Sequence, residues 1–194
     1  MLISAFSFEA VYAQTRVTKR GILKPIKHYA VVLYTGGGIA NYTSAIINQG
    51  LQTSNNRTNP SAMLRIMWHP NYRLRVGIET GLTNFYSYTI KNGNETGKVT
   101  LSAVPILVVW SIPIIKRVNI FAGFGSYYLA THLNYLGKVK SGSFSLGSSI
   151  ALNYVQPITK KIAISTEAKW MNAFQTKDNQ MALQVNLAWK FLEY

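Results

Sequence analysis

The stretch Met181–Tyr194, MALQVNLAWKFLEY, decides the fold, because its apolar and polar residues alternate strictly. One side carries the large apolar residues Met181, Leu183, Val185, Leu187, Trp189 and Phe191. The other carries the small or polar residues Ala182, Gln184, Asn186, Ala188 and Lys190. A strand separates these two sets, whereas a helix would mix them around its circumference. A tilted strand that spans a membrane needs about 9–11 residues, which this stretch supplies.

Seven further stretches with this alternation precede it. They are predicted as strands at 28–42, 61–69, 72–86, 98–111, 118–134, 143–155 and 161–174. Short turns centred on Pro70, Pro113 and Pro157 recur at intervals of 43 and 44 residues. Longer polar loops are expected between them, at 43–59, 87–97, 135–142 and 175–180. Alternating short and long connections are typical of outer-membrane barrels, whose short turns face the periplasm. The sequence therefore predicts an all-β protein, an eight-stranded antiparallel up-and-down transmembrane β-barrel with periplasmic termini.

The composition supports a membrane protein without a membrane-spanning helix. Charged residues make up 13% of the chain, about half of the usual share in a soluble domain. No apolar run reaches the length of about 18 residues that a transmembrane helix requires. The net charge is +14, but the basic residues are scattered and no nucleic-acid-binding signature occurs. We therefore expect the positive charge to meet outer-membrane lipids rather than nucleic acid.

The N-terminal segment resembles the end of a secretory signal peptide. Residues 1–13 have an apolar core, with Val11 and Ala13 at the −3 and −1 positions of a cleavage site. Residues 14–27 are polar and basic and are interpreted as a periplasmic tail. The barrel domain is expected to cover residues 28–194.

Proline and glycine occur inside two predicted strands. Pro105 lacks the N–H that a closed barrel wall requires, so we expect a local bulge at that position. The run Gly36-Gly37-Gly38 lacks the Lys-Ser/Thr and the helix of a phosphate-binding loop. Glycine on an inward strand face instead makes room in a narrow barrel.

Aromatic residues gather near both ends of the predicted strands, as in the two interfacial girdles of membrane barrels. Those expected near the short turns are Trp68, Tyr72, Trp110, Tyr154 and Trp189. Those expected near the long loops are Tyr86, Phe144 and Trp170.

The segment Val104-Pro105-Ile106-Leu107, the turn at residues 113–118 and the run Phe121-Ala122-Gly123-Phe124-Gly125 resemble a known family. It is the small outer-membrane β-barrel family of Gram-negative bacteria, with PorT-like and OmpX-like eight-stranded members. The resemblance covers roughly residues 27–194. It implies a location in the bacterial outer membrane and insertion by the barrel-assembly machinery, for which the terminal Tyr194 resembles the recognition signal.

Charged residues on the inward faces are the candidate site. We expect a structural ion-pair network in the lumen formed by Arg65, Arg75, Glu79, Glu167, Lys169 and Lys190. An eight-stranded barrel is just wide enough for its side chains to fill, and buried charges must be paired. A lumen plugged by side chains is therefore favoured. The alternative is a narrow pore or carrier, in which the basic excess would favour anions.

The sequence contains no recognisable catalytic, cofactor-binding or metal-binding motif. Cysteine is absent, and the three histidines are not clustered with carboxylates at metal-ligand spacing. We therefore expect no enzyme activity, cofactor or metal, and a structural or interaction role in the cell envelope with an envelope protein partner. A lipid-modifying outer-membrane enzyme is the second alternative.

Overall fold

The structure is a computed structural model that describes residues 29–44, 53–70, 72–92, 95–134 and 138–193. The predicted signal peptide, the basic tail and the terminal Tyr194 lie outside the described residues. Within those residues, no helix has the length and apolar character that crossing a membrane requires.

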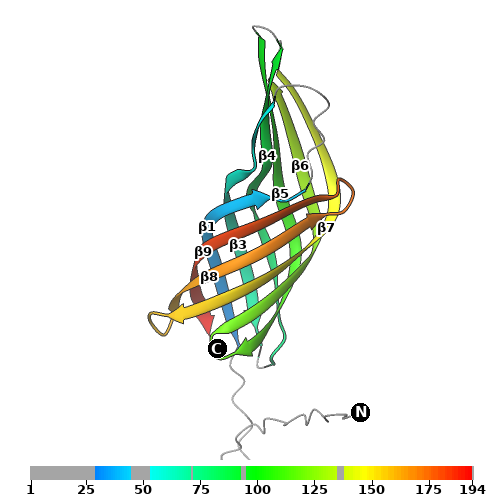
Figure 1. Ribbon diagram of the computed structural model, residues 1–194. Helices are drawn as coiled ribbons and strands as arrows, with labels where there is room; N and C mark the ends of the chain where they lie inside the picture. Colours follow the sequence, from blue (N-terminus) through cyan, green and yellow to red (C-terminus); the bar gives the residue numbers. More distant parts are fainter. Residues whose placement is uncertain (1–28, 45–52, 71, 93–94, 135–137, 194) are drawn as a thin grey trace, which may run out of the picture.

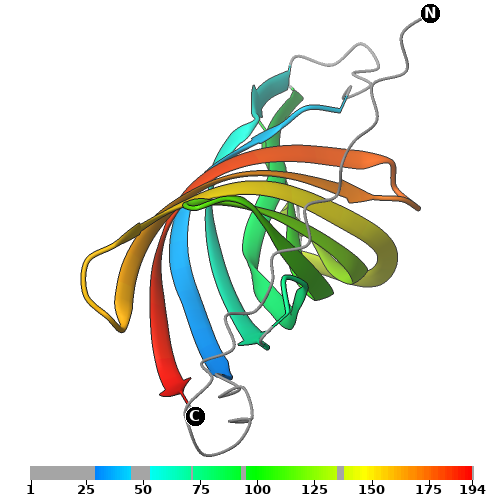
Figure 2. The same cartoon turned by 90° about the horizontal axis from the view of Figure 1, so that it is seen from below.

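Nine β-strands make up the described part of the chain. They are β1 (Ala30–Tyr42), β2 (Thr53–Asn56), β3 (Thr58–His69), β4 (Arg75–Asn92), β5 (Glu95–Ile115), β6 (Val118–Asn134), β7 (Lys138–Pro157), β8 (Ile162–Ala173) and β9 (Asp178–Glu193). Eight of them form an antiparallel wall in the order β4-β3-β1-β9-β8-β7-β6-β5, and pairing of β4 with β5 closes it (Figures 1 and 2). The predicted eight-stranded antiparallel barrel is thus confirmed. The short β2 pairs with residues 87–90 of β4.

The strands place large apolar side chains on the outside, whereas polar, charged and apolar side chains share the inside. Three outward residues have large exposed fractions: Ile78 (62%), Leu183 (61%) and Leu187 (45%). Their neighbours along the strands, such as Glu79, Gln184 and Asn186, are buried in the interior. A soluble barrel would bury the apolar set, so this arrangement is that of a wall that faces lipid.

The two ends of the barrel differ. One end, called the turn end below, carries the connections at residues 70 and 72–74, 116–117 and 158–161. At the other end, the β4–β5 and β6–β7 hairpins extend well beyond the rest of the wall (Figure 1). The predicted loops at 87–97 and 135–142 are wrong in extent, because β4 pairs with β5 as far as Asn92 and Glu95, and β7 begins at Lys138. Likewise, 53–56 form β2, β3 begins at Thr58 and β9 begins at Asp178. In these segments the strands stay paired through their backbones, although the alternation of apolar and polar residues that marks the lipid-facing wall has ended.

Three expectations about proline need correction. Pro113 does not lie in a turn, because β5 continues to Ile115 and residues 116–117 make the connection to β6. Pro157 does not lie in a turn either, because it is the last residue of β7 and pairs with Ala163 on β8. At Pro105 the strand keeps an unbroken register with β6, opposite Tyr127. On its other side the wall is irregular: Gly81 and Leu82 of β4 do not pair with Pro105 and Val104, and β4 shifts register between Asn84 and Tyr86.

Candidate functional site: a charge network inside the barrel

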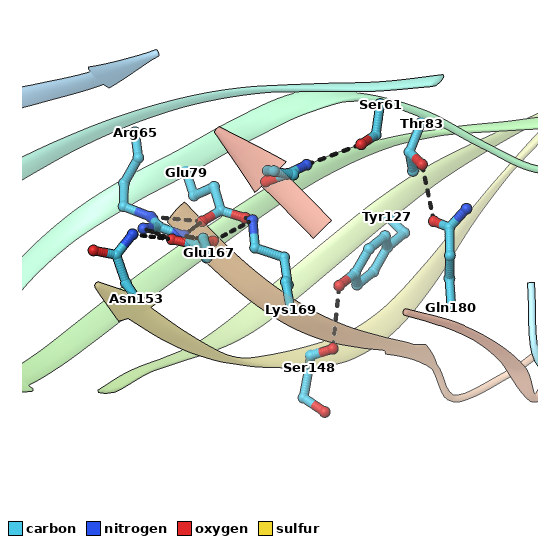
Figure 3. A network of polar contacts seen from close by, with 11 residues as sticks. Ser61, Arg65, Glu79, Thr83, Tyr127, Ser148, Asn153, Glu167, Lys169 and Gln180 are labelled. Carbon is cyan, nitrogen blue, oxygen red and sulfur yellow. Dashed lines mark hydrogen bonds and ion pairs between the residues drawn. The ribbon is translucent and has the colours of Figure 1, made fainter. Parts of the chain in front are cut away.

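Four charged side chains meet inside the barrel (Figure 3). Arg65 on β3 donates a hydrogen bond from Nε to Glu79 on β4 at 2.7 Å, and two from its terminal nitrogens to Glu167 on β8 at 2.8 Å each. Lys169 on β8 contacts Glu79 at 2.8 Å and Glu167 at 3.2 Å. All four side chains are almost fully buried. The cluster holds two positive and two negative charges, so it is neutral as a unit.

Two neighbouring residues, Asn153 and Phe121, also contact the charged side chains of the network. Asn153 on β7 donates from its amide to Glu167 at 3.1 Å and to Ser165 at 3.2 Å. The guanidinium carbon of Arg65 lies 4.1 Å from the ring centroid of Phe121, within the range of a cation–π interaction. These contacts matter because buried charges are tolerated only where their remaining hydrogen-bonding capacity is met.

The two other cations that the sequence placed in this network lie elsewhere. Arg75 is the first residue of β4 and donates a hydrogen bond to Asn119 at 3.3 Å. Lys190 is near the end of β9 and pairs with Glu193 at 3.4 Å, where both side chains are partly exposed. The prediction of a six-residue network is therefore corrected to four residues. Arg75 and Lys190 both line a cavity at the turn end instead.

Further polar contacts fill the barrel between the network and the long hairpins. Gln180 accepts a hydrogen bond from Thr83 at 2.9 Å, and Gln184 donates one to Ser61 at 3.0 Å (Figure 3). Tyr42 donates one to Asp178 at 2.6 Å. These residues are not among those that the sequence predicts for the site. Their inward position on alternating strands was the available signal, but it does not identify the partner across the lumen.

Most of the aromatic residues predicted as girdles lie on the outside of the wall. Those with exposed side chains are Trp68, Tyr72, Trp110, Tyr154, Trp189, Phe144 and Trp170. Tyr86 differs, because the register shift beside it places it opposite the buried Leu101. Its ring packs against that of Tyr42, with 5.0 Å between the ring centroids. Tyr86 is therefore a half-buried interior residue rather than a member of the outer girdle.

A closed wall with an apolar outside and a charged, filled inside defines the class of transmembrane β-barrels. No protein-family model matches this sequence, and no curated protein sequence matches it either. Similarity is found among solved structures. Ail, the attachment invasion locus protein of Yersinia pestis, in complex with the heparin analogue sucrose octasulfate, has a TM-score of 0.52 at 6% identity. That alignment covers 85% of this chain and 99% of Ail.

Two other structures are similar at lower scores. The outer membrane protein OprG from Pseudomonas aeruginosa has a TM-score of 0.48 and 10% identity, with coverage of 84% of this chain and 97% of OprG. The outer membrane protease OmpT from Escherichia coli has a TM-score of 0.43 and 10% identity, with coverage of 85% of this chain and 96% of OmpT. At these identities the similarity to Ail establishes the fold alone: the chain folds as a bacterial outer-membrane β-barrel.

Proposed function

We propose that this protein is an integral outer-membrane β-barrel with a closed lumen and an interaction role in the cell envelope. The observation that carries the proposal is the buried network of Arg65, Glu79, Glu167 and Lys169, which links strands on different sides of the lumen. The short connections and the end of β9 would face the periplasm, because outer-membrane barrels have short periplasmic turns. The extended β4–β5 and β6–β7 hairpins would then project outside the cell.

The packing around the network supports a plug rather than a pore. The cavity beside it, which Glu79, Lys169, Pro105 and Gln184 help to line, measures about 10 Å³. A single water needs roughly 10–15 Å³ measured in this way, so this cavity has room for about one water at most, which supports a filled interior beside the network. The matched charges also leave no excess of one sign that would attract a permeating ion.

Conductance in planar lipid bilayers tests the closed lumen. The purified barrel should give no stepwise current, whereas the double variant Arg65→Ala with Glu167→Ala removes a neutral pair and should admit ion flow. Arg73→Ala changes an exposed turn residue and serves as the control for altered charge. Regular channels from the unaltered protein would overturn the closed lumen in favour of a pore.

The long hairpins are the part of the molecule that supports an interaction role. Both extend backbone pairing past the lipid-facing part of the wall, so they can present a defined surface. A photo-reactive residue at the exposed Ser141 on β7 should crosslink to a partner protein in cells. The same residue at Leu183, on the lipid-facing wall, should give no protein adduct. Identical adduct patterns at the two positions would contradict an interaction through the hairpins.

A further inference from the structure

Basic side chains converge on a cavity at the turn end of the barrel. The cavity has a volume of about 360 Å³ and lies in the mouth of the lumen, lined by inward residues of the wall and by the short connections. Its cationic lining residues are Arg75, Lys116, Arg117, Lys160, Lys161 and Lys190. Among the described residues that line it, none is Asp or Glu.

The positive charge in this cavity is largely unneutralised. Of the six cations, Lys190 alone forms an ion pair with a described residue, the one with Glu193. Among the residues that the structure describes, Arg117 donates hydrogen bonds to two neutral groups, Gln156 at 3.0 Å and the Tyr154 hydroxyl at 3.3 Å. The charge network deeper in the barrel, by contrast, balances every cation with a carboxylate. Repulsion among unpaired cations costs free energy that a bound anion would offset.

One polar group in the cavity wall also lacks a partner. The Nε2 atom of His69 is buried and has no hydrogen bond among the described residues, although His69 lines the cavity. Arg75 lies in the same lining, and its one side-chain hydrogen bond to the described part of the chain is to Asn119 at 3.3 Å. Both groups can therefore donate to a ligand that enters the mouth.

We propose that this cavity binds a small anion that carries phosphate groups. Guanidinium and ammonium groups are the side chains that bind phosphate oxygens best, and arginine can do so with two parallel hydrogen bonds. The volume falls within the range of about 300–1,000 Å³ in which proteins hold small ligands. The cations surround one hollow rather than an extended surface, which suits a compact ligand with several charges over a long polyanion. The phosphate can belong to a soluble molecule or to a phospholipid headgroup, which share this chemistry.

This site does not depend on the proposed closed lumen or on the long hairpins. Conductance reports on the network around Arg65, whereas ligand binding reports on the mouth. Failure of one proposal is therefore distinguishable from failure of the other.

Calorimetric titration with inorganic pyrophosphate tests the proposal on the full barrel in zwitterionic detergent. The unaltered protein should bind one pyrophosphate, and affinity should fall with rising salt because the contacts are electrostatic. The variant Lys160→Gln with Lys161→Gln changes two exposed turn residues and should weaken binding by about tenfold or more. Retained heat-modifiable gel mobility will show that the variant still forms the barrel.

Two controls separate the cavity from general positive charge. Arg73→Gln removes a charge at the same end but outside the cavity lining, and Arg57→Gln removes one at the other end. Each should leave the affinity within about twofold of the unaltered protein, because charges outside the cavity are screened. No measurable pyrophosphate binding, or equal weakening by all these variants, would overturn the proposal. Tighter, cavity-dependent binding of an acidic peptide would also overturn it, in favour of a protein partner.

Lipid nanodiscs distinguish the two sources of phosphate. In zwitterionic discs pyrophosphate should bind as in detergent. If anionic phospholipid in the disc competes with pyrophosphate, and Lys160→Gln with Lys161→Gln removes this competition, the site takes a lipid headgroup. Unchanged pyrophosphate affinity in anionic discs would identify a soluble phosphorylated ligand. Both results support the phosphate site.

Discussion

Arg65 on β3 and Glu167 on β8 form two hydrogen bonds of 2.8 Å with each other, although their strands are separated by β1 and β9 in the wall. The pair therefore crosses the interior of the barrel rather than following its surface. Glu79 and Lys169 lie on the same two sides and close the cluster. This cross-link by charge stands among buried apolar side chains of the barrel interior, such as Met67, Leu107 and Phe121.

Replacement of Arg65 by methionine should destabilise the barrel strongly. Arg65→Met leaves two buried carboxylates with Lys169 as their one remaining cation, so a negative charge stays uncompensated. Breaking a buried ion pair on one side costs about 3–5 kcal/mol. Urea unfolding in detergent, followed by tryptophan fluorescence, should show this loss. Arg73→Met, at an exposed turn position, is the matched control and should change the unfolding free energy by less than about 0.5 kcal/mol. Similar losses in both variants would contradict a special role for the network.

A double-mutant cycle should show that Glu79 and Lys169 act as a pair. Their side chains are 2.8 Å apart and buried, and either single change leaves the interior charged. Glu79→Gln with Lys169→Met together leaves Arg65 balanced by Glu167. The double variant should therefore lose less unfolding free energy than the sum of the single variants, with a coupling of about 1–3 kcal/mol.

The exposed pair of Lys190 and Glu193 provides the control cycle. Its 3.4 Å contact is open to solvent, so its coupling should be about 0.2–1 kcal/mol. Strict additivity of Glu79→Gln and Lys169→Met would mean that the network contributes no mutual stabilisation.

The alternation of apolar and polar residues predicts the lipid-facing part of the barrel wall, but it does not predict where the strands end. The period of two identified inward and outward residues correctly in the lipid-facing part, because lipid demands apolar side chains on every second residue. Beyond the membrane that demand ends, so the paired segments at 87–92 and 95–97 had no such pattern and were predicted as a loop. Alternation predicts an outward position for Tyr86, but the register shift between Asn84 and Tyr86 places it on the inner face. No pattern in the sequence predicts that shift.

The candidate site was predictable in part for a related reason. The alternation of residues along a strand shows which side chains point inward. This is sufficient to predict an interior position for Arg65, Glu79, Glu167 and Lys169. It does not give the height of a residue along the barrel axis, which depends on the stagger between strands. Arg75 and Lys190 are on the inward side of the alternation, but they lie near the strand ends, at the mouth of the lumen. Two residues of the cationic cavity are therefore wrongly predicted as members of the charge network.

Alanine at Gly36 should destabilise the pairing of β1 with β9. Gly36 lies opposite Asn186, and a Cβ atom there would stand 2.6 Å from the Cα atom of Asn186 and still closer to the Val185 carbonyl. Overpacking of this kind costs about 1–3 kcal/mol, which urea unfolding in detergent should detect. Thr35→Val, on the outward face of the same strand, should cost less than about 0.5 kcal/mol. Equal stability of Gly36→Ala and the unaltered protein would show that the strands can separate at this point.

A lysine at Leu183 should impair insertion into lipid. Leu183 lies near the middle of β9 with 61% of its side chain exposed on the wall that faces the hydrocarbon core. A lysine at the bilayer midplane of a barrel costs about 2–4 kcal/mol, and the cost falls toward zero at the interfaces. Ile158 is 58% exposed but lies in a connection at the turn end, so Ile158→Lys is a control matched in exposure. Folding into phospholipid vesicles, measured by gel mobility and reversible urea unfolding, should be weakened by Leu183→Lys and almost unchanged by Ile158→Lys. If both lysines were tolerated equally, the outer face of β9 would not contact lipid, and its exposed leucines would require a protein partner.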